Sequence, residues 1–122
     1  MSNLKQMKNS LGYALEGLAY SFKHNQNIKI HIAIAVLVLL FAYLLGLDKY
    51  EFFIVSFLVV LVLSAEMINT SIEEVVNLLV NEHRIEAKTA KDVSAGMVLL
   101  ISILALVVGL FVFTPHILKL LK

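Results

Sequence analysis

Three polar side chains recur along a predicted helix that is otherwise apolar. Glu66, Asn69 and Glu73 (the polar stripe) are separated by three and four residues, so they share one helix face. They follow residues 52–65, which contain no charge. A carboxylate at bilayer depth costs on the order of a few kcal/mol unless it is paired, hydrated or metal-bound. The pattern therefore favours a functional site; the structural alternative is a buried polar network that specifies helix packing.

A second set of charged residues follows this helix, in residues 81–92. Lys91 and Asp92 end that segment where the next apolar stretch begins, so we expect them at the same membrane surface as the polar stripe. Together these side chains suit phosphoryl transfer. Mg²⁺ typically takes one or two protein carboxylates plus substrate phosphates, a lysine offsets phosphate charge, and a carboxylate deprotonates a hydroxyl.

Simpler roles also exist for these residues. Thr89 and Asp92 have the spacing of a capping box that would begin the third apolar helix, although the usual partner is Glu or Gln. Lys88 and Lys91 also fit topology signals that touch lipid headgroups. No pair of histidines has metal-ligand spacing on a helix, so we expect these residues at the interface with satisfied hydrogen bonds. The histidines are His24, His31, His83 and His116.

The composition places the chain in a membrane. Of its 122 residues 60% are hydrophobic, and the mean hydropathy is +0.89, whereas soluble domains are nearer ~45–50% apolar. A net charge of +1 lacks the basic character that nucleic-acid binding requires, so we expect no nucleic-acid partner. The absence of cysteine excludes disulfides and Cys-based zinc sites.

Three stretches are long and apolar enough to cross a bilayer, which takes ~20 residues. Pro115 is expected to end the third helix, because proline removes a backbone hydrogen bond and clashes with the preceding turn. The prediction is an all-α integral membrane protein with one domain. Its parts are the first span at residues 29–47, the second with a cytoplasmic extension at 52–80, a cytoplasmic loop at 81–90 and the third span at 91–114, all within residues 1–122.

The N-terminal segment, residues 3–24, has a different pattern. Its apolar residues recur at threes and fours, and charged residues fall between them. We expect an amphipathic helix that lies flat on the membrane surface, with its lysines toward the headgroups. The apolar set is Leu4, Met7, Leu11, Leu15, Leu18 and Phe22.

The positive charges predict an orientation. Basic residues are retained on the cytoplasmic side of a membrane. Seven of them precede the first span or lie between the second and third, and three lie on the other side, so the N-terminus and the second loop are predicted to be cytoplasmic. The first group is Lys5, Lys8, Lys23, Lys29, Arg84, Lys88 and Lys91, and the second is Lys49, Lys119 and Lys122.

Two other functional classes fit parts of the pattern. A small oligomeric ion or proton conductor also uses intramembrane carboxylates such as Glu66 and Glu73. A structural subunit of a larger complex would use the small-residue face of Ser102, Ala105 and Gly109 for close helix contact. Formation of an ATP-dependent product separates a phosphoryl-transfer enzyme from the conductor and the structural subunit.

Two motifs resemble those of a known family. The string EMINTSIE at residues 66–73 is followed by AKDVSAG at residues 90–96. Together they resemble the signature of the small prokaryotic diacylglycerol kinase and undecaprenol kinase family, roughly E-x-x-N-[TS]-[AS]-[IL]-E and then A-K-D-x-[GAS]-[AS]-[GA]. The resemblance covers nearly the whole chain. The string NIKIH at residues 27–31 is similar to the R-N-x-x-x-H of the Gram-positive branch, which phosphorylates undecaprenol.

The resemblance implies a function and an assembly. It implies a lipid kinase of the bacterial inner (cytoplasmic) membrane that transfers the γ-phosphate of Mg-ATP to the hydroxyl of undecaprenol or diacylglycerol. It also implies a homotrimer whose active sites lie between subunits at the cytoplasmic membrane surface.

The resemblance also implies a role for each site residue. Glu66 would be the general base toward the lipid hydroxyl. Asn69 would hold the geometry of the site or contact phosphate, and Glu73 would bind Mg²⁺. Lys91 would contact the ATP phosphates. Asp92 would contact the nucleotide or hold the lysine.

One position departs from the family pattern. A glutamate usually stands just before the first span and joins the second carboxylate, here Glu73, at the metal, but this chain has Asn25. An asparagine oxygen still coordinates Mg²⁺ but carries no charge. The expectation is therefore a metal site formed by Glu73 and Asn25, with weaker affinity for Mg²⁺ or with fewer ions.

Overall fold

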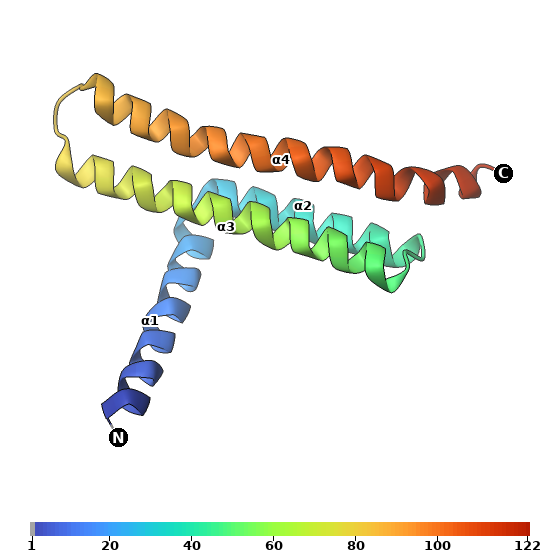
Figure 1. Ribbon diagram of the computed structural model, residues 1–122, viewed down its shortest axis with the longest axis horizontal. Helices are drawn as coiled ribbons and strands as arrows, with labels where there is room; N and C mark the ends of the chain where they lie inside the picture. The colour runs from blue at the N-terminus through green and yellow to red at the C-terminus, as the bar shows by residue number, and fades with distance from the viewer. Residues whose placement is uncertain (1) are drawn as a thin grey trace.

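The computed structural model describes residues 2–122, and these form four helices (Figure 1). They are α1 (Ser2–His24), α2 (Gln26–Leu44), α3 (Lys49–Leu79) and α4 (Ile85–Leu120). The last three lie side by side as a bundle, with α3 in contact with both neighbours, while α1 points away from them. No strand occurs in residues 2–122. The prediction of an all-α chain is confirmed.

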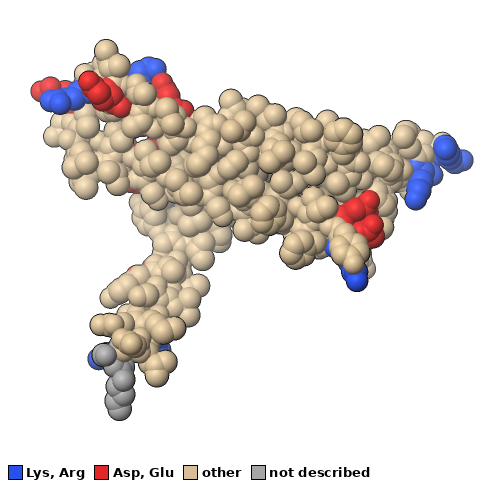
Figure 2. Space-filling view, in the orientation of Figure 1, with Lys and Arg blue, Asp and Glu red and all other residues tan. Residues whose placement is uncertain are grey.

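The bundle has the dimensions and surface of a membrane protein. Each of its three helices is long and apolar enough to cross a bilayer. Figure 2 shows that acidic and basic side chains gather at the two ends of the bundle and leave its middle uncharged. Because a lipid bilayer excludes unpaired charges from its hydrocarbon layer, this distribution fits a bundle that stands across the membrane.

Small residues bring α2 and α3 close together. On α2 the buried positions Ile28, Ala35 and Ala42 are seven residues apart. This is the spacing of one seam of a left-handed helix pair. Alanine on that seam lets two backbones approach, which favours helix association where lipid already solvates apolar side chains. Val55 and Leu58 are among the buried residues of α3, which packs on α2.

A complete Schellman motif ends α2. The amide of Gly46 donates to the carbonyl of Tyr43 and that of Leu47 donates to Ala42, each at 3.1 Å. Gly46 has a φ of +72°, in the left-handed region that only glycine adopts without a steric cost. The turn between the first two apolar helices is therefore determined by this glycine.

A capping box then begins α3. The Asp48 carboxylate accepts from the amides of Tyr50 and Glu51, at 2.8 and 2.9 Å, and the Glu51 carboxylate accepts from the amide of Asp48 at 3.0 Å. These bonds satisfy amides that lack a partner at a helix start. They fix the direction in which α3 re-enters the bundle.

Helix α4 begins before the predicted third span. Helix α4 starts at Ile85, and Arg84 is its N-cap residue without a capping side-chain bond. Thr89 lies inside the helix, where its hydroxyl donates to the carbonyl of Ile85 at 2.9 Å. The interpretation of Thr89 and Asp92 as a capping box is therefore wrong, because the helix already includes both residues.

Helix α4 also extends beyond the predicted third span. Pro115 lies inside α4, which continues to Leu120, so the prediction that proline ends this helix is wrong. A tertiary contact stabilises the turns after the proline. Nε2 of His116 lies 2.9 Å from the Glu51 carboxylate at the start of α3, which holds the turn after the proline against the bundle.

Removing this contact is expected to weaken the bundle at the end opposite the polar stripe. His116→Ala should lower the free energy of unfolding by about 1 kcal/mol, the usual net worth of one hydrogen bond. Thermal unfolding of the purified protein in detergent measures the change. Lys122→Ala, outside the helix, is the control; equal stability of the two variants would show that His116 does not hold the C-terminal turns.

The apolar face of α1 is left uncovered by the rest of the chain. Leu4, Met7, Leu11 and Leu15 are each more than half exposed. α1 contacts the bundle only weakly, mainly through α2. This arrangement agrees with an amphipathic helix whose apolar face rests on lipid, as the sequence predicts.

Candidate active site

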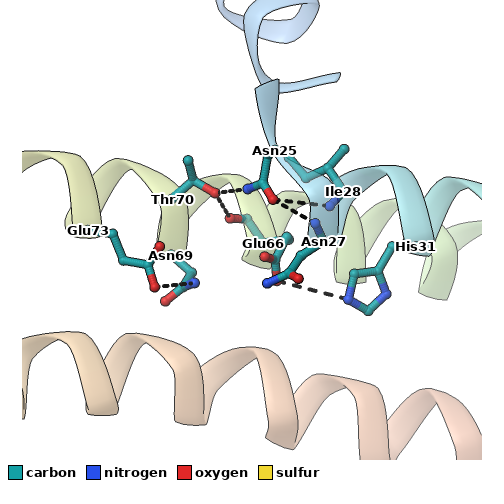
Figure 3. Close-up of polar contacts among 8 residues, drawn as sticks. All are labelled: Asn25, Asn27, Ile28, His31, Glu66, Asn69, Thr70 and Glu73. Carbon is teal, nitrogen blue, oxygen red and sulfur yellow. Dashed lines mark hydrogen bonds and ion pairs between the residues drawn. The ribbon is translucent and has the colours of Figure 1, made fainter. Parts of the chain in front are cut away.

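The polar stripe lies on α3, but its residues face different neighbours. Glu66 and Asn69 are buried, with 3% and 5% of their surface exposed, and Glu73 is half-buried. In Figure 3, Glu66 faces His31 of α2, whereas Asn69 and Glu73 lie on the side toward α4. One stripe therefore contributes to two helix interfaces.

Glu66 is a buried carboxylate with unused bonding capacity. Its Oε2 lies 4.0 Å from Nε2 of His31, which is too long for a hydrogen bond. Its Oε1 is buried and has no hydrogen-bond partner. Because buried polar atoms are nearly always bonded, an unsatisfied carboxylate oxygen indicates a place for a ligand or water.

Asn69 connects the stripe to α4. The Ser94 hydroxyl donates to Oδ1 of Asn69 at 2.6 Å and also lies 2.9 Å from the carbonyl of Lys91. The Asn69 amide nitrogen lies 3.5 Å from the Glu73 carboxylate. Asn69 thus orients Glu73 weakly and holds α4 at the level of Lys91.

Lys91 and Asp92 point to different partners. The Lys91 ammonium donates to Oδ1 of Asn77 at 2.5 Å, across the α3–α4 interface. The Asp92 carboxylate is exposed and accepts from the Lys88 ammonium at 2.6 Å, one turn earlier. Asp92 therefore holds Lys88 and not Lys91, and the implied pairing of Asp92 with Lys91 is absent from residues 2–122 of one chain.

The partnership with Asp92 also affects Lys88. The hydrogen bond to Asp92, and then the attraction of its negative charge, raise the pKa of Lys88 above its ordinary value. Lys88 lies before the uncharged stretch of α4 that begins at Val93, in the part of the helix outside the apolar layer. It therefore stays cationic at neutral pH.

Asn25 joins the start of α2 to α3. Its Oδ1 accepts from the amides of Asn27 and Ile28, at 2.9 and 3.3 Å, which caps α2. Its Nδ2 donates to the Thr70 hydroxyl, which in turn donates to the carbonyl of Glu66 at 2.9 Å (Figure 3). Both ends of the amide are occupied, so Asn25 has a structural role at the position where a metal ligand was predicted.

A basic pocket lies between the ends of α3 and α4. It has a volume of about 340 Å³, and three basic residues outnumber two acidic ones in its lining. Its polar lining residues are Arg84, Lys88, Lys91, Glu82, Asp92, Asn77 and His83. Three cationic side chains around a pocket of this size suit a polyphosphate, because charge-assisted hydrogen bonds to phosphate oxygens are strong.

An apolar groove lies on the other side of Glu66. It has a volume of about 470 Å³ and runs between α2, α3 and α4. His31 lines it, and the remaining residues are apolar or small, including Ser102, Ala105 and Gly109. The small-residue face noted in the sequence therefore forms one wall of this groove.

The sequence reasoning missed three residues of the site. Asn77 continues the spacing of the polar stripe by four residues beyond Glu73, and this periodicity was a usable signal. Ser94 follows Lys91 by three residues, within the second motif. His31 was assigned to the interface, and only its position opposite Glu66 gives it a specific part in the site.

Comparison with known proteins supports the interpretation from the motifs. The family described as prokaryotic diacylglycerol kinase matches residues 12–113. An undecaprenol kinase from Bacillus subtilis (strain 168) is 31% identical over 114 residues, which cover 93% of each chain.

Two diacylglycerol kinases are also similar to this chain. That of Synechocystis sp. is 38% identical over 113 residues, covering 92% of this chain and 65% of the relative, so the chain spans about two thirds of that protein. That of Haemophilus influenzae is 26% identical over 113 residues, covering 92% of this chain and 96% of the relative. With four helices, both motifs and this extent of similarity, the chain belongs to the prokaryotic diacylglycerol kinase family of lipid kinases.

Proposed function

We propose that this chain transfers the γ-phosphate of ATP to the hydroxyl of a membrane lipid at the cytoplasmic end of its bundle. The observation that carries the proposal is the buried Glu66 carboxylate with an unpartnered Oε1. Along α3, Glu66 comes after the residues that line an apolar groove suited to lipid and before those that line a basic pocket suited to phosphate, and it lines neither cavity itself. Family membership supports the reaction class.

Glu66 acts as the general base in this proposal. The lipid hydroxyl oxygen forms a bond to the γ-phosphorus, and the bond from that phosphorus to the β–γ bridging oxygen breaks, releasing ADP. The hydroxyl proton passes to the Glu66 carboxylate. General base catalysis by a positioned side chain typically contributes about 10²- to 10⁴-fold.

The nucleotide is assigned to the basic pocket. Lys91 would contact the transferring phosphate and the side chains of Arg84 and Lys88 the remaining phosphates, since these three cations line one cavity. Asp92, on the rim, would contact the nucleotide directly or through Lys88. Asn69 would hold the geometry of this side of the site through Ser94.

Mg²⁺ fits the site as a partner of the nucleotide. Residues 2–122 contain no group of three or more His, Cys, Asp or Glu side chains placed to hold a metal. Mg²⁺ needs only one or two protein carboxylates when substrate phosphates supply other ligands, so Glu73 fits as a ligand beside bound ATP. When bound, the ion offsets phosphate charge. Asn25 would join Glu73 only by sharing the Oδ1 that caps α2.

Substitutions at Asn25 separate capping from metal binding. Asn25→Asp keeps a capping oxygen and adds a charge, so we expect a several-fold lower Mg²⁺ concentration for half-maximal activity. Asn25→Ala removes the cap and should lower stability by about 1 kcal/mol. Mg²⁺ titrations of activity, with thermal unfolding in parallel, measure both effects. If neither variant shifts the Mg²⁺ midpoint, Asn25 is a cap alone.

We further infer a homotrimer with sites completed between subunits. Glu66 faces α2, whereas Lys91 of α4 is bonded to Asn77 near the end of α3. Within residues 2–122 of one chain no hydrogen bond or ion pair joins Glu66 to Lys91. No residue in the most apolar stretch of α4 is buried, although α3 packs along this helix, so α4 keeps an open face. A neighbouring copy packed on that face would bring its own Lys91 toward Glu66.

We also propose residence in the bacterial inner membrane with the N-terminus and the site facing the cytoplasm. Seven of the ten basic residues lie on α1, at the start of α2, in the α3–α4 loop or in the first turns of α4. Basic residues near membrane spans favour the cytoplasmic side. The substrate is assigned to undecaprenol or diacylglycerol, the lipids named for the relatives.

The test is transfer of labelled γ-phosphate from Mg-ATP to lipid by the purified protein. Undecaprenol and diacylglycerol are supplied in parallel, and the ratio of the two products identifies the preferred acceptor. We expect labelled lipid phosphate with at least one of them. No labelled lipid from a folded oligomer with ample Mg²⁺ would contradict the proposal and favour a conductor or a structural subunit.

A further inference from the structure

His31 and Glu66 face each other across the α2–α3 interface with a gap between them. The imidazole Nε2 and the carboxylate Oε2 are 4.0 Å apart, and Figure 3 shows the two side chains pointing toward one another. His31 is partly exposed, whereas Glu66 is buried with its Oε1 unpartnered. A carboxylate buried this deeply without bonds is costly, so its environment suits a further bonding group.

The size of the gap admits one oxygen atom, of a water molecule or of an alcohol. A direct hydrogen bond requires about 2.7–3.2 Å, so the two side chains do not bond to each other. One oxygen atom placed about 2.8 Å from the carboxylate and about 2.9 Å from Nε2 satisfies both. An alcohol hydroxyl has the required polarity: it donates its proton to the carboxylate and accepts from the imidazole N–H, in the tautomer protonated on Nε2.

The surroundings specify what is attached to the hydroxyl. His31 lines the apolar groove of about 470 Å³ and is its one ionisable side chain. Ile34, Ala35 and Val38 continue the α2 wall away from His31, and Val62 and Leu63 face them from α3. A molecule with its oxygen between His31 and Glu66 therefore has a long hydrocarbon chain in the groove.

We propose that His31 binds and orients the hydroxyl of the acceptor lipid against Glu66. This inference rests on the proposed function and adds a substrate contact to it. The Nε2–H of His31 donates to one lone pair of the hydroxyl oxygen and leaves the other free to attack the γ-phosphorus. As the proton passes to Glu66, the same N–H stabilises the negative charge that develops on the oxygen.

The matched substitutions are His31→Gln and His31→Leu. Both are close to histidine in size, but only glutamine keeps an N–H donor near the position of Nε2. His24→Leu is the control, because His24 is an exposed histidine on α1, away from the groove. Thermal unfolding of all variants in the same detergent shows that the bundle remains folded.

Binding is measured without reference to catalysis. Native mass spectrometry in detergent gives the affinity of the protein for a C20 prenyl alcohol and for the alkane with the same carbon skeleton. We expect His31→Leu to weaken binding of the alcohol about tenfold, the effect of one lost hydrogen bond, and to leave binding of the alkane unchanged. His31→Gln should recover part of the difference, and His24→Leu should match the wild type.

Kinetics with a C55 polyprenol and with dioleoylglycerol form the second arm. We expect His31→Leu to raise KM and lower kcat for the lipid whose hydroxyl binds between His31 and Glu66 (the hydroxyl slot). KM for ATP should be unchanged, and His31→Gln should recover part of the lost activity. The two lipids distinguish which alcohol occupies the slot. If His31→Leu raised KM for ATP as much as KM for the lipid, the contact would not be specific to the acceptor lipid.

The outcomes separate this inference from the proposed function. If the wild type binds the alcohol through His31 but transfers no phosphate, the hydroxyl slot stands and the kinase proposal fails. If the wild type phosphorylates lipid and His31→Leu behaves like His24→Leu in both arms, the kinase proposal stands and the slot is overturned. A change in oligomer mass without a change in alcohol binding would also overturn it, because the groove would then hold a second copy.

Discussion

Replacing Glu66 by glutamine is expected to lower the rate of lipid phosphorylation by about 10²- to 10⁴-fold. Glutamine keeps the size of the side chain and the ability of Oε1 to accept a hydrogen bond, but it does not take up a proton at neutral pH. The position is buried and Oε1 has no partner, so the neutral side chain should be tolerated in the fold. The loss should therefore appear in kcat, with KM for ATP nearly unchanged.

The matched control is Glu74→Gln. Glu74 lies on the same helix one residue beyond the polar stripe and is exposed. It should retain wild-type activity. Steady-state rates with saturating lipid and ATP, together with the thermal stability of each variant, make the comparison. A Glu66→Gln protein that is stable and keeps more than a tenth of the wild-type kcat would contradict the role of general base.

Replacing Lys91 by methionine is expected to lower kcat by about 10²- to 10³-fold, the usual effect of removing one donor that stabilises charge in the transition state. Methionine keeps an unbranched side chain as long as lysine up to Cε, without the ammonium group. Because Lys91 lines the basic pocket, KM for ATP should rise as well, and KM for lipid should not. Measurements of kcat and of both KM values test this pattern.

Lys91 also donates a hydrogen bond to Asn77, so a loss of activity through weaker helix packing must be distinguished from a loss of phosphate binding. Asn77→Leu removes the hydrogen bond between the helices and leaves the ammonium in place. If Asn77→Leu reduces kcat as strongly as Lys91→Met, the lysine acts by holding α3 and α4 together. Lys119→Met, at the far end of α4, controls for the loss of one positive charge.

Much of the fold was predictable because helices in a membrane are determined locally. In lipid every backbone polar group must be satisfied within its own segment, so a long apolar stretch becomes a helix whatever its neighbours. The three membrane-length helices follow from this rule, and the amphipathic α1 follows from the helical spacing of its apolar residues. The spacing of Glu66, Asn69 and Glu73 likewise placed them on one face, since each residue advances about 100° around the helix axis.

The helix ends were less predictable because long-range contacts contribute to them. Pro115 weakens one turn of α4, yet the helix continues where His116 meets Glu51, sixty-five residues away in the sequence. No local pattern contains that contact. The start of α4 at Ile85 was missed because a local signal is lacking there. Its N-cap residue, Arg84, forms no capping side-chain hydrogen bond.

The sequence by itself determined which chemical groups are present, on which helices they lie and to which family the motifs point. Only the tertiary structure decided how those groups are paired. It directs Glu66 to His31 and Lys91 to Asn77, and it uses Asn25 as a helix cap. The physical reason is that spacing along one helix fixes angles about that helix alone. Contacts between helices depend on the rotation and register of two packed helices. Small buried residues such as Ala35 and Ala42 of α2 contribute to both, because they let the helix backbones approach closely.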